Sequence, residues 1–345
     1  MTDLKGYLQS NYYKYIDGIY FSEKLKYNLN ISQELNNEFF NKLKKSNSKT
    51  AVNLFMPEIE DIIFSSRSEA ALELLNHNNE GICIDYGSTW GVPSIGMAKR
   101  GHQVISVNQT YKFLEFLKIR TQEEGLKNIN LVQDDIRKVE FKNIADFAII
   151  DGVLERIPEK FIHYLDQKLN YHDRSNIQSS DNPLQNPRDM QVSFLKKVYK
   201  SLKKEGQLLL TIDNRFSYKY FIGQPDLYTN LRFVTFLPRI FSNIISLMFR
   251  KKNYRNFTYS FSELKDLLGE AGFDIIEDYC CFPTYRSPSI ILPNTKIGIN
   301  QYENYEDKNI ITWTQKFIFK YFEIILMKYM KLKNLCPSIV IIAKK

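Results

Sequence analysis

The residues of this 345-residue chain whose types and spacing best suit chemistry follow a short apolar run. The run GICID ends in Asp85, and Gly87 and Gly91 come soon after it. Glycine has no side chain to block a close approach, so the backbone of such a turn can lie against a bound ligand. Asp85 can accept hydrogen bonds from the turn or from a cationic ligand, and Ser88 can donate one. A bulky Trp90 also lies in the turn, and the pattern alone is common at ordinary strand-to-helix turns.

Polar residues also end three later apolar runs. They are Asn108 after HQVISV, Asp134 and Asp135 after NINLVQ, and Asp151, followed by Gly152, after DFAII. If these runs are parallel strands, right-handed crossovers bring all their carboxyl ends to one edge of a sheet. We therefore expect these side chains and the glycine turn to converge on a single binding site.

Segments with strand and helix patterns alternate around these residues. The strand-like segments are 81–85, 102–108, 128–135, 146–151, 207–214, 273–282 and 338–345. The helix-like segments are 32–45, which Ser32 would cap, 65–81, 93–101, 111–125, 194–206 and 260–273. Strands that alternate with helices across short turns predict an α/β fold with a doubly wound, Rossmann-like sheet.

The domain organisation follows from where this alternation begins and where it breaks. Residues 1–64 show no clear strand alternation and predict a helical N-terminal segment. Residues 65–345 are expected to form the α/β domain. Polar or aromatic insertions interrupt that domain at about 168–189 and 215–257, and they predict a cap over the edge of the sheet.

Composition argues against several classes of protein. The net charge of +8 weakly favours anionic partners, but Lys, Asn, Ile and Tyr are abundant along the whole chain, so no nucleic acid is favoured. The four cysteines have no C-x-x-C spacing and lie in or beside apolar runs, which predicts buried free thiols and no metal site. The first residues lack an apolar signal core and no apolar run is long enough to span a membrane, so we expect a cytoplasmic protein.

The order of these segments resembles that of class I S-adenosylmethionine-dependent methyltransferases over about residues 65–290. The resemblance is carried by IDYGSTWGVPSIGMAKRGHQVISVN, NLVQDDI, DFAIIDGVLERIP and LKKEGQLLLTIDN, with SIVIIAKK as the expected last strand. It implies S-adenosyl-L-methionine as the cofactor. The cofactor-binding residues would be Asp85, Gly87, Ser88, Gly91, Asn108, Asp134, Asp135, Asp151 and Gly152.

The resemblance also implies which part of the cofactor each residue contacts. Asp85 and the glycine turn would line the methionine and ribose, and Asp135 would face the adenine amine. Asp151 and Gly152 would lie beneath the sulfonium. Asn108 departs from the family pattern, because it replaces the acid that accepts hydrogen bonds from the ribose; loss of that charge assistance is worth about 1 kcal/mol.

Two further departures from the family pattern affect the same region. Thr89 replaces the central glycine of the turn, and Arg156 stands where a histidine is common. A weakened or retuned cofactor site is therefore an alternative to an ordinary one. Loss of binding does not follow, because a threonine can still line the turn and donate a hydrogen bond.

A narrower resemblance lies beyond the cofactor half. It is carried by IIFSSRSEAALELL, IDNRFSYKYFIGQP, YSFSELKDLLGEAGF and CFPTYRSPSIIL, which are similar to methyltransferases associated with surface-polysaccharide and related glycan biosynthesis. This implies that the methyl group passes to an oxygen, or a nitrogen, of a sugar-containing or other small-molecule acceptor. Two alternatives stay open: a non-catalytic partner subunit with the same fold, and a methyltransferase of a small secondary metabolite.

A hydroxyl acceptor would also need a base. The candidates are Asp151, Glu155, His172 and Asp213. Each could take the proton if its side chain lies within hydrogen-bond reach of the acceptor. Alignment of the two reactants at close range in a dry site would supply most of the rate enhancement.

Residues 236–252 combine an apolar helical pattern with a basic end, RKK. The stripe consists of Leu237, Ile240, Phe241, Ile244, Ile245 and Met248, and the narrow polar face of Ser242, Asn243 and Ser246. One hypothesis is a cap helix packed on the sheet or on a second subunit of a homo-oligomer. The other is an interfacial helix in peripheral contact with a membrane, whose basic end meets lipid phosphates.

Overall fold

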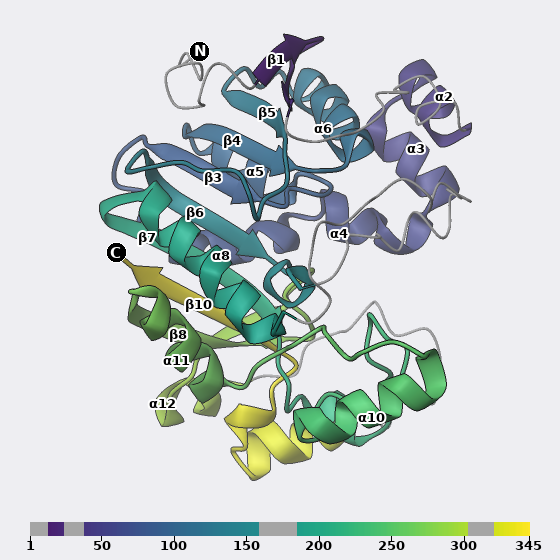
Figure 1. Ribbon diagram of the computed structural model, residues 1–345, viewed down its shortest axis with the longest axis vertical. Helices are drawn as coiled ribbons and strands as arrows, with labels where there is room; N and C mark the ends of the chain where they lie inside the picture. Colours follow the sequence, from purple (N-terminus) through teal and green to yellow (C-terminus); the bar gives the residue numbers. More distant parts are fainter. Residues whose placement is uncertain (1–12, 24–37, 159–184, 303–320) are drawn as a thin grey trace.

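A ten-stranded sheet lies at the centre of the computed structural model, which describes residues 13–23, 38–158, 185–302 and 321–345 (Figure 1). The strands are β1 (Tyr13–Ile16), β2 (Ile19–Ser22), β3 (Ile82–Tyr86), β4 (Gln103–Asn108), β5 (Ile129–Gln133), β6 (Ala145–Asp151), β7 (Leu202–Asp213), β8 (Asp274–Phe282), β9 (Ile290–Pro293) and β10 (Ser338–Lys344). Their order across the sheet is β1-β2-β5-β4-β3-β6-β7-β10-β8-β9.

The strand order identifies where this sheet is suited to bind a ligand. From β3 the chain builds outward through β4 to β5, and then returns to place β6 and β7 on the other side of β3, all five strands being parallel. The order therefore reverses between β3 and β6. Open α/β sheets bind ligands at the carboxyl ends of the strands at such a reversal.

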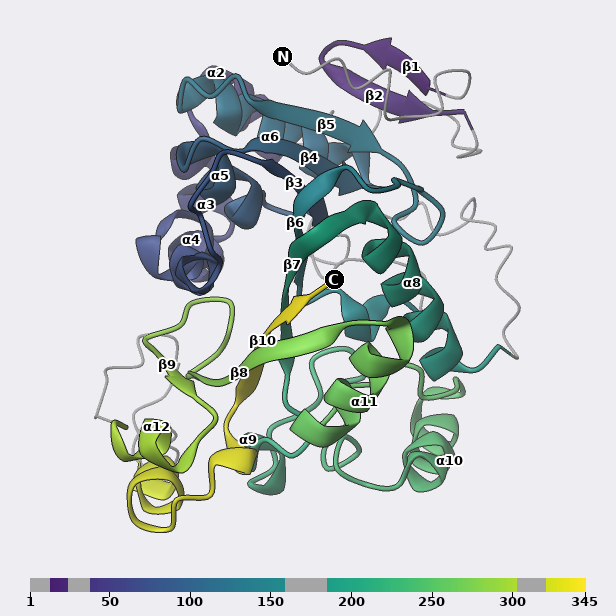
Figure 2. The ribbon, with the colours of Figure 1, turned by 90° about the vertical axis from the view of Figure 1, so that its left-hand side faces the viewer.

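Helices cover both faces of the sheet, which confirms the doubly wound, Rossmann-like fold (Figure 2). Helices α5 and α6 lie on one face together with α2, α3 and α4, while α8 and α11 cover the other face. Their bounds are α2 (Glu38–Lys45), α3 (Ser48–Phe55), α4 (Glu60–Phe64), α5 (Val92–Lys99), α6 (Tyr111–Glu123), α8 (Pro187–Ser201) and α11 (Phe261–Ala271).

Shorter helices and the cap elements complete the described chain. The α-helices are α9 (Tyr218–Phe221), α10 (Arg239–Arg250) and α12 (Lys296–Asn300). The single turns and irregular helices are η3 (Pro57–Ile59), η4 (Ser66–Leu74), η5 (Leu154–Arg156), η6 (Ile325–Tyr329) and η7 (Lys333–Leu335). Among the described helices, none has the length and apolar character needed to cross a bilayer.

The two largest apolar clusters of the core lie on opposite faces of the sheet. Side chains such as Ile84 and Leu210 face α8 and α11, whereas their neighbours Cys83 and Leu209 face α5 and η4. Successive residues of a strand point to opposite faces, so the near-continuous apolar runs of β3 and β7 fill both clusters. The four cysteines are buried and unpaired, as expected.

The N-terminal segment differs from the prediction, because part of it is a β-hairpin and not a helix. β1 and β2 pair antiparallel, with Tyr13 opposite Ser22, and β2 extends the sheet by pairing with β5. Asp17 and Gly18 form the turn with φ of +48° and +84°. An Asp-Gly pair between alternating apolar residues is a strong signal for such a turn, and it is present in YKYIDGIYFS.

Several predicted boundaries also shift. The helix expected over 65–81 is η4, and it ends at Leu74. The helix expected over 194–206 is α8, which starts earlier, because the Asn186 side chain caps it and Pro187 occupies its first turn. Most of the insertion at 168–189 and the predicted cap Ser32 lie outside the described residues.

Candidate active site

Two glycines shape the turn that joins β3 to α5. Gly87 and Gly91 have φ of +89° and +74°, which other residues adopt only under strain. The Cβ atoms that they lack would lie 2.7 Å from Val153 Cγ2 and 2.2 Å from Leu117 Cδ1. Glycine is required at both positions by backbone conformation and by core packing, whereas the sequence had suggested the approach of a ligand.

The amides of this turn are largely used within the chain. The N–H groups of Gly87 and Ser88 donate to the carbonyl oxygen of Val107 on β4, at 2.9 and 3.3 Å. Thr89 N–H donates to Gly87 O, and Gly91 N–H donates to Ser88 O. These four donors are therefore not free to cradle the phosphate of a nucleotide. The Ser88 hydroxyl is buried and has no hydrogen-bond partner in the described part of the chain.

Trp90 does not fill the turn. Its ring packs edge-on against Phe113 and Phe116 of α6, with ring centroids 5.2 and 4.9 Å apart. The same cluster contains the apolar side chains of α2, α3 and α4. Trp90 therefore anchors the N-terminal helices to the domain.

Asp85 lies at the end of β3 and is 1% exposed. Its Oδ2 accepts a hydrogen bond of 2.6 Å from the Ser94 hydroxyl of α5, which also contacts Ser106 Oγ at 2.6 Å. Burial raises the pKa of Asp85 to about 7, and the charge of Asp151 adds to the rise, although hydrogen bonds from Ser94 oppose it. This carboxylate already occupies the amino end of α5, where a phosphate would otherwise bind.

Asn108 lies at the end of β4, as expected, and is buried. Its Oδ1 accepts the N–H of Thr110 at 2.9 Å and so begins the turn into α6. Its carbonyl oxygen accepts the N–H of Asp134 at 3.2 Å, which places the ends of β4 and β5 side by side.

The carboxylates that follow β5 both have partners within the chain. Asp134 accepts the hydroxyl of Tyr13, from β1, at 2.5 Å, and burial raises the pKa of Asp134. Asp135 accepts Nε and Nη2 of Arg137 at 2.9 and 2.7 Å. Burial alone would raise the pKa of Asp135, but the hydrogen bonds and charge of Arg137 hold it below its ordinary value. A ligand at this end would have to share or displace these partners.

Asp151 ends β6 and Gly152 follows it; on the neighbouring strand β3, Asp85 lies opposite Ile149, two residues before Asp151. The Thr211 hydroxyl of β7 donates to Asp151 Oδ1 at 2.5 Å, and burial raises the pKa of Asp151. Gly152 has φ of +62°, and a Cβ there would lie 1.9 Å from the Tyr285 hydroxyl oxygen. Gly152 has no side chain at this point, and the Tyr285 hydroxyl occupies the space that a Cβ atom would fill.

Glu155, on η5, is fully buried. The Tyr228 hydroxyl donates to its Oε1 at 2.6 Å, whereas Oε2 has no partner among the described residues. Burial raises the pKa of Glu155 to about 7, the charge of Asp213 adds to the rise, and the Tyr228 hydrogen bond opposes it. Of the base candidates that the structure describes, Glu155 combines a pKa near neutrality with an unpartnered oxygen.

Asp213, at the end of β7, accepts the Ser338 hydroxyl at 3.2 Å and Arg286 Nη1 at 3.4 Å. The Arg286 guanidinium also lies 4.4 Å from the Tyr285 ring centroid, and its charge favours the ionised forms of Asp151 and Glu155. The structure thus brings three predicted base candidates around one arginine. The fourth, His172, lies outside the described residues.

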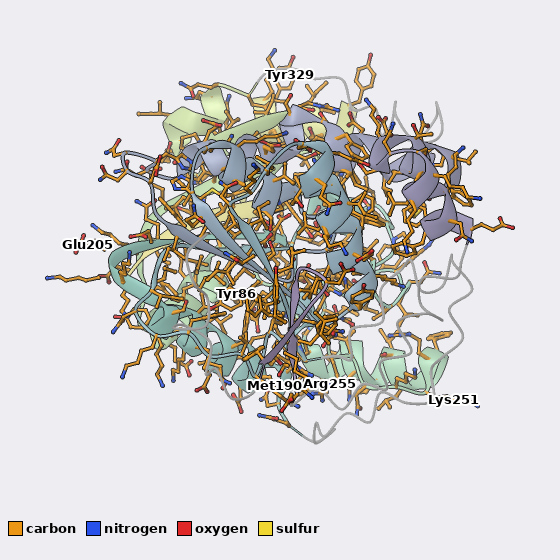
Figure 3. All side chains as sticks on the ribbon, turned by 90° about the horizontal axis from the view of Figure 1, so that it is seen from above. Tyr86, Met190, Glu205, Lys251, Arg255 and Tyr329 are labelled. Carbon is orange, nitrogen blue, oxygen red and sulfur yellow. The ribbon has the colours of Figure 1, made fainter. Side chains whose placement is uncertain are left out.

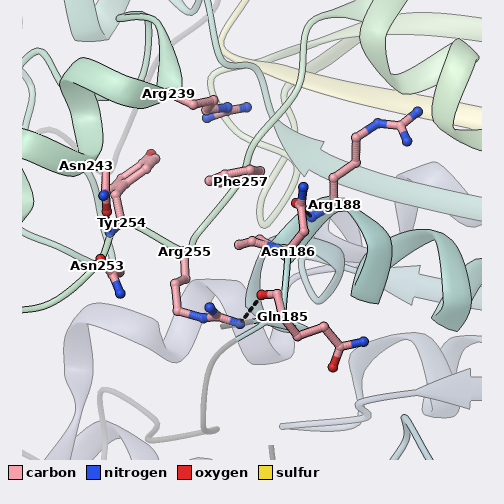
Figure 4. A pocket seen from close by; sticks show the side chains of 10 residues that line it. Gln185, Asn186, Arg188, Arg239, Asn243, Asn253, Tyr254, Arg255 and Phe257 are labelled. Atoms are coloured by element: carbon pink, nitrogen blue, oxygen red, sulfur yellow. Dashed lines mark hydrogen bonds between the residues drawn. The ribbon is translucent and has the colours of Figure 1, made fainter. Parts of the chain in front are cut away.

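A cavity of about 540 Å³ lies between the amino end of α8 and α10 (Figure 4). Arg188, Arg239 and Arg255 line it, together with amide side chains and the ring of Phe257. Between the lining residues Arg255 and Phe257, Asn256 donates through Nδ2 to the Glu155 carbonyl oxygen at 3.4 Å, which links this segment to η5. Guanidinium and amide donors next to an aromatic ring suit a polar or anionic small molecule.

Some residues of the site were not foreseen from the sequence. Ser94, Thr211 and Tyr228 each donate to a carboxylate that was predicted, but nothing in the local sequence identifies them. They come from α5, β7 and the 215–257 insertion, so only the fold brings them to the site. Among the described residues, no group of three or more His, Cys, Asp or Glu side chains is placed to hold a metal ion.

Comparisons with known proteins locate similar folds among solved structures. No protein-family profile and no curated protein sequence matches the chain. An S-adenosylmethionine-dependent methyltransferase from Mesorhizobium loti is 11% identical with a TM-score of 0.43, over 82% of this chain and 100% of that one. One from Methanosarcina mazei is 13% identical with a TM-score of 0.42, over 80% and 96%. The cyclase SpnF is 12% identical with a TM-score of 0.41, over 81% and 79%. Such low values do not transfer a ligand or an activity to this chain.

Proposed function

We propose that this protein is an S-adenosylmethionine-dependent methyltransferase that methylates an oxygen, or a nitrogen, of a sugar or a glycan-pathway intermediate. The observation that carries the proposal is a pair of carboxyl groups, the buried Asp85 and the partly buried Asp151, on neighbouring strands at the strand-order reversal. Burial raises the pKa values of both groups, because desolvation disfavours their ionised forms. A cationic ligand at this point would favour the ionised forms.

S-adenosylmethionine fits that requirement better than a nucleotide that carries phosphates. It is cationic at the sulfonium and has no phosphate, whereas the turn has four amides already used and a carboxylate at the amino end of α5. The residues that would hold it are Asp85, the unpartnered Ser88 hydroxyl, Asn108 and Asp151. The cofactor would supply an activated methyl group, and the chain's own residues would position the acceptor and receive its proton.

Glu155 is the residue that we assign to proton removal. Tyr228 fixes Oε1, and Oε2 is buried without a partner in the described chain, so an acceptor hydroxyl would have an oxygen to which it could donate once it is admitted to this position. A pKa of about 7 leaves a substantial fraction of the carboxyl ionised at neutral pH while keeping it basic enough to take a proton. The site is dry, because Glu155 is fully buried.

The arginine-lined cavity supports a polar acceptor. Its guanidinium and amide groups suit the hydroxyls of a sugar or an attached phosphate or carboxylate, and the Phe257 ring offers a face for a sugar ring. Labelled S-adenosylmethionine with pools of sugars, sugar phosphates and sugar nucleotides would identify the acceptor by transfer of the label.

Calorimetry with S-adenosylmethionine and with its neutral thioether product tests the proposal. The cation should bind, and its affinity should rise as pH increases through about 7, because ionised Asp85 then faces it. Asp151→Asn should lower the affinity for the cation more than for the neutral thioether, whereas Asp266→Asn, on an exposed position of α11, should change neither. Failure of the folded protein to bind either compound would overturn the proposal.

The alternative of a non-catalytic partner subunit is favoured by one set of contacts. Asp134, Asp135 and Asn108 already use side-chain oxygens on Tyr13, Arg137 and Thr110. Because hydrogen bonds within the chain already satisfy these oxygens, this end of the sheet can be stable without a bound ligand. The same calorimetry separates the two functions, since a partner subunit without a cofactor would give no heat of binding.

A further inference from the structure

Helix α10 carries its apolar side chains toward solvent. Its exposed residues are Ile240 (74%), Phe241 (57%), Ile244 (47%), Leu247 (44%), Met248 (71%) and Phe249 (73%). Its polar residues point inward: Ser242 and Ser246 are fully buried and donate to the carbonyl oxygens of Val234 and Lys252 at 2.7 and 2.8 Å. Packing of the apolar stripe on the sheet is therefore wrong, whereas packing on a second subunit, the other part of the cap-helix hypothesis, stays a prediction.

The charge around this face has one sign. Arg250, Lys251 and Lys252 follow the apolar stripe, and the two lysines are exposed. Residues 236–252 contain no Asp or Glu. An exposed apolar helix face beside a basic cluster is the arrangement of helices that lie in a membrane interface.

A second segment repeats the pattern. The helical residues 321–329 and the turn after them expose Tyr321 (54%), Ile325 (47%), Tyr329 (72%) and Met330 (56%), with Lys328 and Lys331 also exposed. Glu323 is the one acidic residue of 321–335, and it is buried, where it accepts the hydroxyls of Tyr218 and Tyr302.

Both segments lie at the same end of the molecule. In Figures 1 and 2, α10 and the yellow helical segment before β10 occupy the end opposite the β1–β2 hairpin. Viewed along the long axis, Lys251 and Tyr329 lie far apart across its width (Figure 3). Short α9 is at the same end and exposes Phe221 (44%). We define the basal face as α9, α10 and residues 321–332.

We propose that the basal face docks on an anionic lipid bilayer, with α10 in the plane of the interface. Two apolar strips at one end of the molecule, each with basic residues beside it, match a bilayer, which is apolar inside and anionic at its headgroups. A second copy of this chain is a poorer occupant, because a symmetric pairing would bring like-charged clusters together without any exposed acidic residue on α10 or 321–332 to oppose them. The inference does not rest on the proposed function.

Vesicle flotation tests the proposal with the full chain. The protein should float with vesicles of equal parts phosphatidylglycerol and phosphatidylcholine at low salt, and far less with phosphatidylcholine alone. Changing Arg250, Lys251 and Lys252 together to Gln should weaken partitioning about 100-fold, because each basic residue near an anionic surface contributes about a 5-fold gain. High salt should reproduce that loss.

Matched variants at other positions distinguish docking through the basal face from non-specific binding to vesicles. Changing Lys42, Lys44 and Lys45 of α2 to Gln removes the same charge from another part of the molecule and should leave flotation unchanged. Met248→Ser with Phe249→Ser should abolish flotation while the melting temperature stays near that of the parent, because both side chains are over 70% exposed. Leu54→Ser on α3, also exposed (62%), is its control.

Three outcomes would overturn the proposal. One is absence of flotation of the folded protein at low salt. Another is equal loss with the α2 variant, which would indicate attraction by net charge alone. The third is self-association in analytical ultracentrifugation that Met248→Ser with Phe249→Ser abolishes while vesicle binding is absent, which would assign the basal face to a second copy.

Discussion

At the scale of single residues, the role of Gly87 can be tested by comparison with Gly125. Both glycines have a positive φ, but only Gly87 has another side chain close to its Cβ position. Gly125 has φ of +68° and nothing within 4 Å of the Cβ position, so Gly125→Ala should cost only the left-handed strain, about 1 kcal/mol. Gly87→Ala adds a contact with Val153 Cγ2 at 2.7 Å and should cost more than about 2 kcal/mol. Urea unfolding measures both.

Val153→Ala in the Gly87→Ala background should recover part of the difference, because it removes the atom that the new methyl group meets. Equal costs at the two glycines would show that packing against Val153 is relaxed. In either case a larger residue at Gly87 perturbs the fold itself, so loss of ligand binding in such a variant would not locate the site.

Asn108 gives a test of cofactor placement that leaves the turn intact. Asn108→Asp keeps an oxygen for the Thr110 N–H and presents a carboxylate at the end of β4. If the ribose lies there, S-adenosylmethionine should bind more tightly by about 1 kcal/mol, since a charged acceptor makes a stronger hydrogen bond. Calorimetry measures the gain. Unchanged affinity would place the ribose elsewhere.

The raised pKa of Glu155 predicts how the free energy of unfolding of the ligand-free protein varies with pH. Its pKa is raised from 4.5 to about 7 in the folded state, so the folded chain holds a proton that the unfolded chain releases. The stability from this group is fully present below about 4.5 and is lost as pH rises toward and through about 7. Glu155→Gln stays neutral, so its stability should fall less steeply across that window, by up to about 1.4 kcal/mol per pH unit.

Urea midpoints at a series of pH values provide that measurement. Glu277→Gln, at an exposed position of β8, is the control and should keep the slope of the parent. Identical slopes for Glu155→Gln and the parent would mean that Glu155 is not held neutral in the folded chain.

At the scale of elements, Trp90 couples the turn to the N-terminal helices. Trp90→Ala should cost about 3–5 kcal/mol, since it empties the contact with Phe113 and Phe116, and Trp90→Phe should cost less. Hydrogen exchange should show faster exchange in α3 and α4 than in β3, because the cluster that contains Trp90 is built by the helices. Uniform loss of protection over all three would contradict this division.

The elements also show what the sequence could predict. The strand ends at Asp85, Asn108 and Asp151 were foreseeable, because apolar runs and turn residues are local signals. The partners were not: Tyr13 lies 121 residues from Asp134, and Tyr228 lies 73 residues from Glu155. The β1–β2 hairpin was not predicted, although the Asp17-Gly18 pair that forms its turn is a signal in the local sequence. The exposure of the apolar stripe of α10 could not be predicted from periodicity. The spacing of apolar residues identifies which side chains share one side of a helix, but not whether that side packs on the protein or meets solvent.

At the scale of the whole molecule, the base candidates gather because three separate parts of the chain meet at one edge. The parallel strands supply Asp151 and Asp213, the segment after β8 supplies Arg286, and the 215–257 insertion supplies Tyr228. Helix α10 belongs to the basal face and also supplies Arg239 and Asn243 to the arginine-lined cavity, so a docked bilayer would be near that cavity.

The position of β10 has a consequence for how the protein is made. β10 follows both β7 and β8 in the chain, yet it lies between them and pairs with both. During synthesis, the edges of β7 and β8 that pair with β10 therefore stay unpaired until residues 338–344 leave the ribosome. Strands β3 to β6 can already pair with one another before then. Nascent chains stalled before Ser338 should be cleaved by protease within residues 202–282 while residues 82–151 resist; equal resistance of both regions would show that the sheet closes without β10.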